Sequence, residues 1–530
     1  MTSRVRWILF GGVLLIGATV VISHMQSWMP KPAPSRVMLS HRVVQPQLEA
    51  PAPPFSSDEV LKFLAEAKQA EVIADPMRRC LAYPDPPGSH WSREAVESYC
   101  RYRFQKLVSF AEVKKLVQSS RVAELDRRMA DALQAQHTRP ESRGLLDRTY
   151  SADFSDPSED VRTILDAWKR QSPKSPFALA ASGMSYVEMA QYARGDAFIQ
   201  DTSEDKIESM ERLLARAKYD LDAAVTIDSR VTPAYTMMIY SAGLEGSEHY
   251  AVDAAKRGLT ADPNNYAIYE QLMWLAQPKW GGSLDNMTRI GDMARAHVKN
   301  NPLLLLLLPE APAMAANLND CDCSNQAALT AYKSVLDQVG GTKLLAAAGQ
   351  ALNTGNHPEM AMIYLSETLR FTPDLVSARA TRIFNLTNLG ETQWALAEGN
   401  HLVATVPKNE NSFDARGYVY NAQGDYVNAE KDFRRALTIN PKDTWTLATL
   451  GRIYADSTHE WDKAWDIANQ LIQDKPDDPS GWMLRANIQK NQPRQGLNET
   501  ITSFNARFIN DPNHQQEVVQ MLMLEQSASK

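Results

Sequence analysis

The chain has 530 residues, a formal net charge of −7 and 44% hydrophobic residues, which leaves room for about two to four domains that each bury a core. The charge is mild and spread evenly, and no block of Lys and Arg occurs. Nucleic acid is excluded as a partner, because phosphates are neutralised by clustered cations. Membrane binding through surface charge is excluded for the same reason.

The first element along the chain is an apolar run preceded by two cations. Arg4 and Arg6 come before residues 7–22, which carry no charge, and a weaker apolar stretch continues to residue 25. This length can cross a hydrocarbon core of roughly 30 Å, and neither a good cleavage site nor a lipid-attachment cysteine comes after it. We expect residues 1–27 to be an uncleaved signal anchor that crosses the membrane through residues 7–25. A cleaved secretory signal is the alternative.

The residues on either side of this run predict its orientation and the nature of the next segment. The cations before the run lie closer to it than Lys31 and Arg36 after it, so we expect the N-terminus in the cytoplasm. In a bacterium, the chain would then be a single-pass protein of the inner membrane with most of its residues in the periplasm. Residues 28–56 hold seven prolines, which favour polyproline II and predict a semi-rigid tether.

The chain has four cysteines, Cys80, Cys100, Cys321 and Cys323. In an oxidising compartment four cysteines allow three pairings. We favour a disulfide between Cys80 and Cys100, which would close a Pro- and Gly-rich loop between two helices. Cys321 and Cys323 are too close in sequence for an unstrained bridge. No His or further Cys stands near them in sequence, so we expect no metal site there.

The middle of the chain holds two distinctive strings. Leu-Asp-Ala-Trp at 165–168 is followed by Pro-Lys-Ser-Pro at 173–176, and Pro-Lys-Trp-Gly-Gly-Ser stands at 278–283. In these strings residues 115–300 resemble a bacterial family of unassigned function, often with an N-terminal membrane segment and a fold like that of tetratricopeptide repeats. The resemblance implies architecture and little about activity. The loop residues Lys279, Trp280, Gly281 and Gly282 are a candidate recognition loop. The alternative is a turn in which Trp280 packs back on its own hairpin.

Prolines mark a repeat in the C-terminal part. Pro373, Pro407 and Pro441 are 34 residues apart, and Pro476 and Pro512 come after 35 and 36 further residues. The unit that ends at Pro441 places small and aromatic residues at the spacing of the tetratricopeptide (TPR) pattern: Phe413, Gly417, Tyr420, Ala429, Phe433 and Ala436. The chain resembles TPR proteins here, which implies a stack of antiparallel helical hairpins.

These patterns predict an all-α fold: a single N-terminal transmembrane helix followed by an α-solenoid of TPR-like hairpins. After the anchor and the tether we expect a helical N-terminal region at 57–155, a divergent TPR-like domain at 156–341 and TPR repeats with a C-terminal cap at 342–530. One repeat is degenerate, because Arg379 and Arg382 stand where apolar residues are expected. The repeat that ends at Pro476 has one inserted residue near His459.

In TPR stacks the first helix of each hairpin lines a groove that binds an extended peptide, and the resemblance assigns that role to nine residues here. They are Phe384, Asn388, Asp414, Tyr418, Asn421, Arg452, Asn487, Lys490 and Asn491. Amides and cations suit the backbone or carboxylate of a peptide. The alternative is a solvated face without a ligand.

Motifs of catalysis are absent from the sequence: it has no nucleophile elbow, phosphate loop or zinc-protease helix, and its ten histidines are scattered singly. We therefore expect a membrane-anchored TPR scaffold or adaptor in the bacterial cell envelope that binds a protein or peptide and is not an enzyme. No cofactor and no metal is expected. The alternatives are an enzyme with its active site in residues 57–230 and an immunity-type binder that neutralises a toxin.

Overall fold

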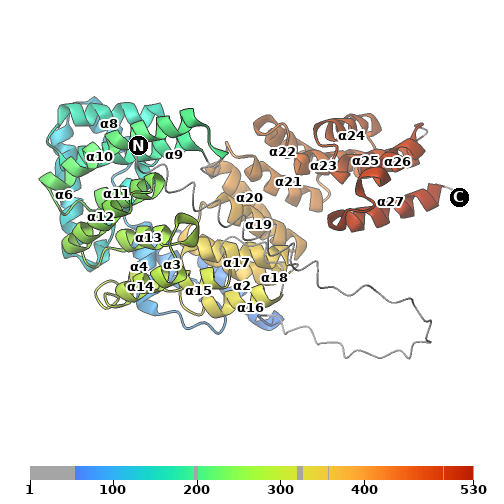
Figure 1. The fold of residues 1–530 in the computed structure, drawn as a ribbon. Coiled ribbons are helices and arrows are strands. Elements are labelled where there is room, and N and C mark those ends of the chain that lie inside the picture. Colours follow the sequence, from blue (N-terminus) through green and yellow to red (C-terminus); the bar gives the residue numbers. More distant parts are fainter. Residues whose placement is uncertain (1–53, 196–200, 319–325, 356, 493, 529–530) are drawn as a thin grey trace, which may run out of the picture. The chain divides into compact units, whose positions relative to one another are not determined.

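The computed structural model describes residues 54–195, 201–318, 326–355, 357–492 and 494–528. All regular structure in these ranges is helical (Figure 1), so the expected all-α class is confirmed for them. None of their helices is long and apolar enough to cross a membrane. The expected anchor, the tether up to residue 53, and the pair Cys321 and Cys323 lie outside the described residues.

The N-terminal half of the described chain contains helices of varied length. The first three are α2 (Ser57–Glu71), α3 (Pro76–Ala82) and α4 (Arg93–Phe104). The next nine elements are α5 (Phe110–Gln118), α6 (Val122–Thr138), η1 (Pro140–Ser142), α7 (Leu145–Asp153), α8 (Glu159–Gln171), α9 (Pro176–Arg194), α10 (Glu204–Ile227), α11 (Thr232–Glu245) and α12 (Glu248–Ala261). Ser56 and Ser109 begin α2 and α5 with capping boxes, in which the serine and a glutamate three residues later bond each other's backbone.

The C-terminal half contains the hairpins. It begins with α13 (Tyr266–Leu275), η3 (Pro278–Trp280), α14 (Leu284–Arg295), η4 (Pro302–Leu307), α15 (Glu310–Ala315) and α16 (Gln326–Val335). It continues with α17 (Thr342–Thr354), α18 (Pro358–Phe371), α19 (Val376–Asn388), α20 (Thr392–Thr405), α21 (Glu410–Ala422), α22 (Tyr426–Ile439), α23 (Thr444–Arg452), η5 (Ile453–Ser457), α24 (Trp461–Asp474), α25 (Pro479–Asn491), α26 (Leu497–Phe508), η6 (Pro512–His514) and α27 (Gln515–Ala528). From α17 to α26 the odd-numbered helices are first helices and the even-numbered ones are second helices.

The repeat pattern sets the packing of these hairpins. Pro373, Pro407 and Pro441 each stand two residues beyond the end of a second helix, where a missing N–H costs nothing. A Cβ on Gly417 would lie 3.0 Å from the ring of Phe433 on the paired helix, so only a small residue lets the two helices approach. Ala429, one turn before Phe433 on α22, is fully buried. The hairpins therefore form where the TPR pattern places them.

The inserted residue near His459 has a clear structural effect. The first helix of that repeat runs on from α23 into η5, which is a π-helix, and a π-turn holds one residue more than an α-turn. His459 then takes a positive φ of 56° to leave the helix. The extra residue is absorbed at the end of the helix, and α24 and α25 keep the hairpin arrangement.

The N-terminal helices do not form a core of their own. Helices α2–α4 share a core with α13–α21, and α5–α7 share a second core with α8–α13. The change from one core to the other falls near residue 105, within the region expected at 57–155. The ring of Tyr99 on α4 stacks on that of Phe371 on α18 at 4.2 Å, although the two residues are far apart in sequence.

Further contacts fix α3 and α4 to the repeats. A disulfide joins Cys80 and Cys100, whose Cα atoms are 5.9 Å apart, and links the two helices to each other. Arg370 of α18 donates a hydrogen bond to the carbonyl oxygen of Cys80 at 2.7 Å. Trp91 Nε1 donates to the carbonyl oxygen of Leu336 at 2.9 Å. The N-terminal helices are thus bonded to α16–α18 by polar groups as well as by apolar contact.

Candidate functional site

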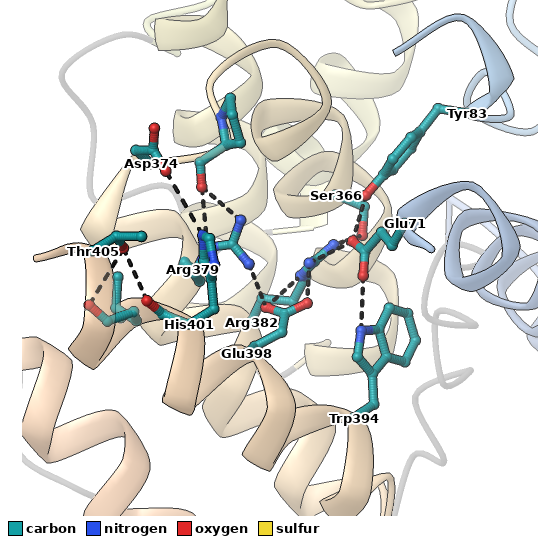
Figure 2. A network of polar contacts seen from close by, with 12 residues as sticks. Glu71, Tyr83, Ser366, Asp374, Arg379, Arg382, Trp394, Glu398, His401 and Thr405 are labelled. Atoms are coloured by element: carbon teal, nitrogen blue, oxygen red, sulfur yellow. Dashed lines mark hydrogen bonds and ion pairs between the residues drawn. The ribbon is translucent and has the colours of Figure 1, made fainter. Parts of the chain in front are cut away.

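A buried polar network lies where α2 meets the degenerate repeat (Figure 2). Arg382 of α19 is fully buried and lies between two carboxylates, Glu71 of α2 and Glu398 of α20. Arg382 Nη2 is 2.5 Å from Glu71 Oε1, and Arg382 Nη1 donates to Ser366 Oγ at 3.1 Å. Arg379 lies 3.5 Å from Glu398. Two cations and two carboxylates balance, as burial of charge requires.

Aromatic groups complete this network and bear on its protonation. Trp394 Nε1 donates to Glu71 Oε2 at 2.8 Å, and the Tyr83 hydroxyl donates to Glu71 Oε1. Burial opposes ionisation of Glu71, but Arg382 and these hydrogen bonds outweigh it and hold the pKa of Glu71 below its ordinary value. Burial likewise opposes the charge on Arg382, and the two carboxylates outweigh it and raise the pKa of Arg382. The ion pair is therefore charged at neutral pH, and it attaches α2 to the repeats.

The next repeat holds the same pair without the N-terminal cover. Arg416 and Asp432 stand 34 residues beyond Arg382 and Glu398. Arg416 donates to both carboxylate oxygens of Asp432, at 2.7 and 2.8 Å, and to Asn400 Oδ1 at 3.1 Å. The Arg416 side chain keeps 20% exposure where that of Arg382 has none. The two misfit arginines of the degenerate repeat thus have a structural role.

Three aromatic side chains from consecutive first helices form a cluster that we call the aromatic face: Phe384 of α19, Tyr418 of α21 and Trp445 of α23. The rings of Phe384 and Tyr418 are 4.9 Å apart at 86°, and Trp445 lies 5.4 Å from Phe384. Phe384 and Tyr418 are half-buried, and Trp445 is 40% exposed. Exposed aromatic rings held rigidly by helices provide much contact area at a low cost in side-chain entropy.

Polar residues continue this surface on both sides. The Tyr418 hydroxyl donates to Asn388 Oδ1 at 2.7 Å. Further along, Asn487 Nδ2 donates to Asp456 Oδ1 at 2.8 Å, and Asn491 Nδ2 donates to Asn487 Oδ1 at 2.8 Å. The structure therefore brings Phe384, Asn388 and Tyr418 together, and separately Asn487 and Asn491.

The remaining expected groove residues fall into two groups. Arg452 and Lys490 are exposed and Asn421 is half-buried, all on first helices. Asp414 does not reach the surface: it is 2% exposed, and its Oδ1 accepts a hydrogen bond from Thr446 at 2.7 Å. Burial raises the pKa of Asp414 to about 7, against the lowering effect of that hydrogen bond. We leave Asp414 out of the candidate surface, because its place is between two first helices.

Two residues of this surface, Trp445 and Asp456, were not predicted from the sequence. Trp445 is the second residue of α23, near its N-terminus, whereas the expected positions were drawn from later turns. Asp456 lies in the π-helical extension, which shifts the register. Gly451 marks α23 as the first helix of a repeat. Trp445 could have been found from the sequence as the aromatic residue near the start of that helix.

The candidate loop at 279–282 lies against its own hairpin. Trp280 ends η3, and its ring centroid is 4.5 Å from that of Trp274 on α13. Gly281 has a positive φ of 86°, and a Cβ on Gly282 would lie 2.1 Å from the carbonyl oxygen of Ala276. Two glycines are needed for this tight turn, which holds Trp280 against Trp274.

A polar cavity of about 600 Å³ lies between α4, η1 and residues 299–303, partly within the residues 57–230 where an active site was the alternative. Its charged lining residues are three acids, Glu94, Glu97 and Glu141, and three bases, Arg101, Arg143 and Lys299. Two of the acids bond residues outside this set: the Ser92 hydroxyl donates to Glu94 at 2.9 Å, and Arg93 pairs with Glu97 at 2.9 Å. Within the described ranges no group of three or more His, Cys, Asp or Glu could hold a metal ion.

Comparison with known proteins supports the repeat pattern. Residues 420–488 match the family model described as tetratricopeptide repeat. This part of the chain carries tetratricopeptide repeats. No curated protein sequence matches the chain significantly. The resemblance of residues 115–300 to a bacterial family of unassigned function stays a prediction.

Three solved structures illustrate how distant the similar folds are. A tetratricopeptide repeat protein from Parabacteroides merdae is 14% identical, with 55% of this chain and 98% of that chain covered and a TM-score of 0.32. The Cut9–Hcn1 hetero-tetramer of the APC/C is 13% identical over 77% and 95%, with a TM-score of 0.34. The TPR domain of P58(IPK) is 14% identical over 70% and 94%, with a TM-score of 0.22. At these TM-scores the likeness supports no further statement about this chain.

Proposed function

We propose that the protein is a non-catalytic scaffold or adaptor that binds an extended segment of a partner protein on the first helices of its C-terminal repeats. The observation that carries this proposal is the aromatic face, in which three rings from three consecutive hairpins meet and Trp445 stays 40% exposed. Apolar side chains of the partner would pack on these rings.

The polar groups beside the aromatic face suit the rest of such a segment. The amides of Asn388 and Asn487 can donate to and accept from a peptide backbone. Arg452 and Lys490 are exposed cations on the same series of first helices and can pair with a carboxylate of the partner. Binding would therefore combine apolar anchoring on the rings with polar recognition along the stack.

Capture by matched variants of the full-length protein tests this function. Trp445→Ala combined with Tyr418→Ala should lower recovery of the partner at least about tenfold, because buried aromatic anchors at interfaces contribute ~2 kcal/mol or more each. Val427→Ala is the control, since Val427 is 80% exposed on the second helix α22. Equal recovery of the same partners by the double variant and the wild type would contradict the proposal.

We further propose that residues 7–25 anchor the protein in the bacterial inner membrane, with the N-terminus in the cytoplasm and residues 54–530 in the periplasm. The cations Arg4 and Arg6 before the apolar run support this orientation. A C-terminal alkaline phosphatase fusion should be active, and a C-terminal fluorescent reporter that folds only in the cytoplasm should stay dark. The opposite pair of results would refute this placement.

A further inference from the structure

The middle of the molecule repeats the geometry of the aromatic face. Tyr240 and Trp274 are the ninth residues of α11 and α13, as Phe384 and Tyr418 are the ninth residues of α19 and α21. The ring centroids of Tyr240 and Trp274 are 5.0 Å apart at 70°, close to the 4.9 Å and 86° of the C-terminal pair. The same face of the helices therefore presents paired rings in both regions.

A glycine makes this close approach possible, and the loop at 278–283 supports it. A Cβ on Gly243 of α11 would lie 2.9 Å from the ring of Trp274. On another side, Trp280 lies 4.5 Å from Trp274. Tyr240 and Trp274 remain half-buried, so each keeps part of its ring open. The loop thus acts as the support for Trp274.

A carboxylate lies near enough to Tyr240 for its charge to act on the phenol, and it occupies a helix position whose residue forms a hydrogen bond elsewhere in the stack. Asn388 and Asp456 stand thirteen residues into first helices, counted from the starts of α19 and α23. Each is hydrogen-bonded to the ninth residue of the next first helix: Asn388 to Tyr418 and Asp456 to Asn487. Glu188 is the thirteenth residue of α9, and the next first helix is α11. The ninth residue of α11 is Tyr240. No described residue forms a hydrogen bond or ion pair with the Glu188 side chain.

The electrostatics agree with this placement. Burial raises the pKa of Glu188 to about 7, and no cation offsets it. Burial and then the charge of Glu188 raise the pKa of Tyr240 to about 12. Arg194 ends α9, the helix that carries Glu188, and its charge lowers the pKa of Tyr240. Its guanidinium donates a hydrogen bond to the carbonyl oxygen of Gly195 at 3.1 Å.

We propose that Glu188, Tyr240 and Trp274 form a second binding surface, distinct from the aromatic face, that accepts a lysine or arginine side chain of a protein segment. A half-buried carboxylate without a partner is unfavourable until a cation reaches it. An ammonium or guanidinium group is attracted to the faces of Trp and Tyr rings. Together the three groups match a basic side chain in charge and in shape.

Selection from a displayed library of random dodecapeptides tests this surface in the full-length protein. In the pool selected by the wild type, Lys and Arg should rise about fivefold at one position over the input library, the factor expected for a single cation–π and carboxylate contact. Glu188→Gln, which keeps size and removes the charge, should return that position to the input frequency. Trp274→Leu should do the same, and Trp274→Phe should retain most of the enrichment.

Two controls separate this surface from general charge and from the proposed function. Glu208→Gln removes an equal charge from an exposed position on α10 and should leave the enrichment unchanged. Trp445→Ala should remove peptides that need the aromatic face but keep the basic enrichment. A wild-type pool without basic enrichment, or equal enrichment with Glu188→Gln, would overturn the inference and leave the aromatic face untouched.

Discussion

The hairpins α19/α20 and α21/α22 each hold a pair of an arginine and a carboxylate at equivalent positions, but the two pairs have different surroundings. In the first hairpin Arg382 is fully buried, because Glu71 of α2 pairs with it and Trp394 of α20 bonds that glutamate. In the second hairpin Arg416 pairs with Asp432 and keeps contact with solvent. The difference shows how a repeat is changed when another part of the chain packs on it. The covered hairpin needs a second carboxylate, and the uncovered one does not.

The comparison also separates attachment from recognition. The N-terminal helices cover α18–α20 with ion pairs, a disulfide-linked helix pair and stacked rings. Helix α21 still shares the core of α2–α4, and no described N-terminal helix belongs to the core clusters of α22–α27. The exposed Trp445 belongs to this uncovered part. We interpret the buried contacts of α18–α20 as the attachment of the N-terminal helices, and the ring-bearing side of the first helices α19, α21 and α23 as the binding surface.

The largest expected effect comes from removing the covered arginine. Arg382→Ala leaves Glu71 buried without its cation and leaves Glu398 with Arg379 alone, at 3.5 Å. This should lower local stability by about 3–5 kcal/mol. Arg416→Ala breaks a pair in which the Arg416 side chain is 20% exposed and reaches solvent, and it should cost less, about 1.5–3 kcal/mol. Hydrogen exchange of the α19–α22 amides in the full-length protein measures both. Equal losses would show that the cover by α2 has no energetic consequence.

A second prediction tests whether the two hairpins share the TPR register. Ala429 is fully buried where α22 meets α21, so Ala429→Leu should overpack the contact and destabilise the hairpin by about 1–3 kcal/mol. Val427→Leu on the exposed side of α22 should change the melting temperature little. An unchanged melting temperature for Ala429→Leu would contradict the register.

The sequence was informative where the constraints are local. Small residues at Gly417 and Ala429 and a proline after each second helix are separated by fixed distances, so the hairpins could be predicted. Arg382 could be recognised only as a misfit, because its partner Glu71 lies in another part of the chain. Asp414 was assigned to the surface because helix periodicity does not show which residue of the next repeat covers it. The residue that does so is Thr446 of α23.

The smallest effect concerns the variation of stability with pH. The pKa of Asp414 is raised to about 7 in the folded protein, whereas an unfolded Asp has a pKa of about 3.9. Between these values the unfolded chain loses the proton and the folded chain keeps it, so this group lowers stability as pH rises from about 4 to 7. Asp414→Asn keeps the acceptor for Thr446 and removes this dependence. Melting temperatures at pH 4, 5.5 and 7 check it; identical profiles would refute the assignment.

Site-specific photocrosslinking in living cells tests the central claim, that the aromatic face on the first helices α19, α21 and α23 binds a partner protein. A photoreactive phenylalanine analogue is placed at Trp445 on the aromatic face and, as the control, at Val427 on α22, which is 80% exposed. We expect a crosslinked species of defined mass from position 445 and none from position 427. The same species from both positions, or none from position 445, would contradict it.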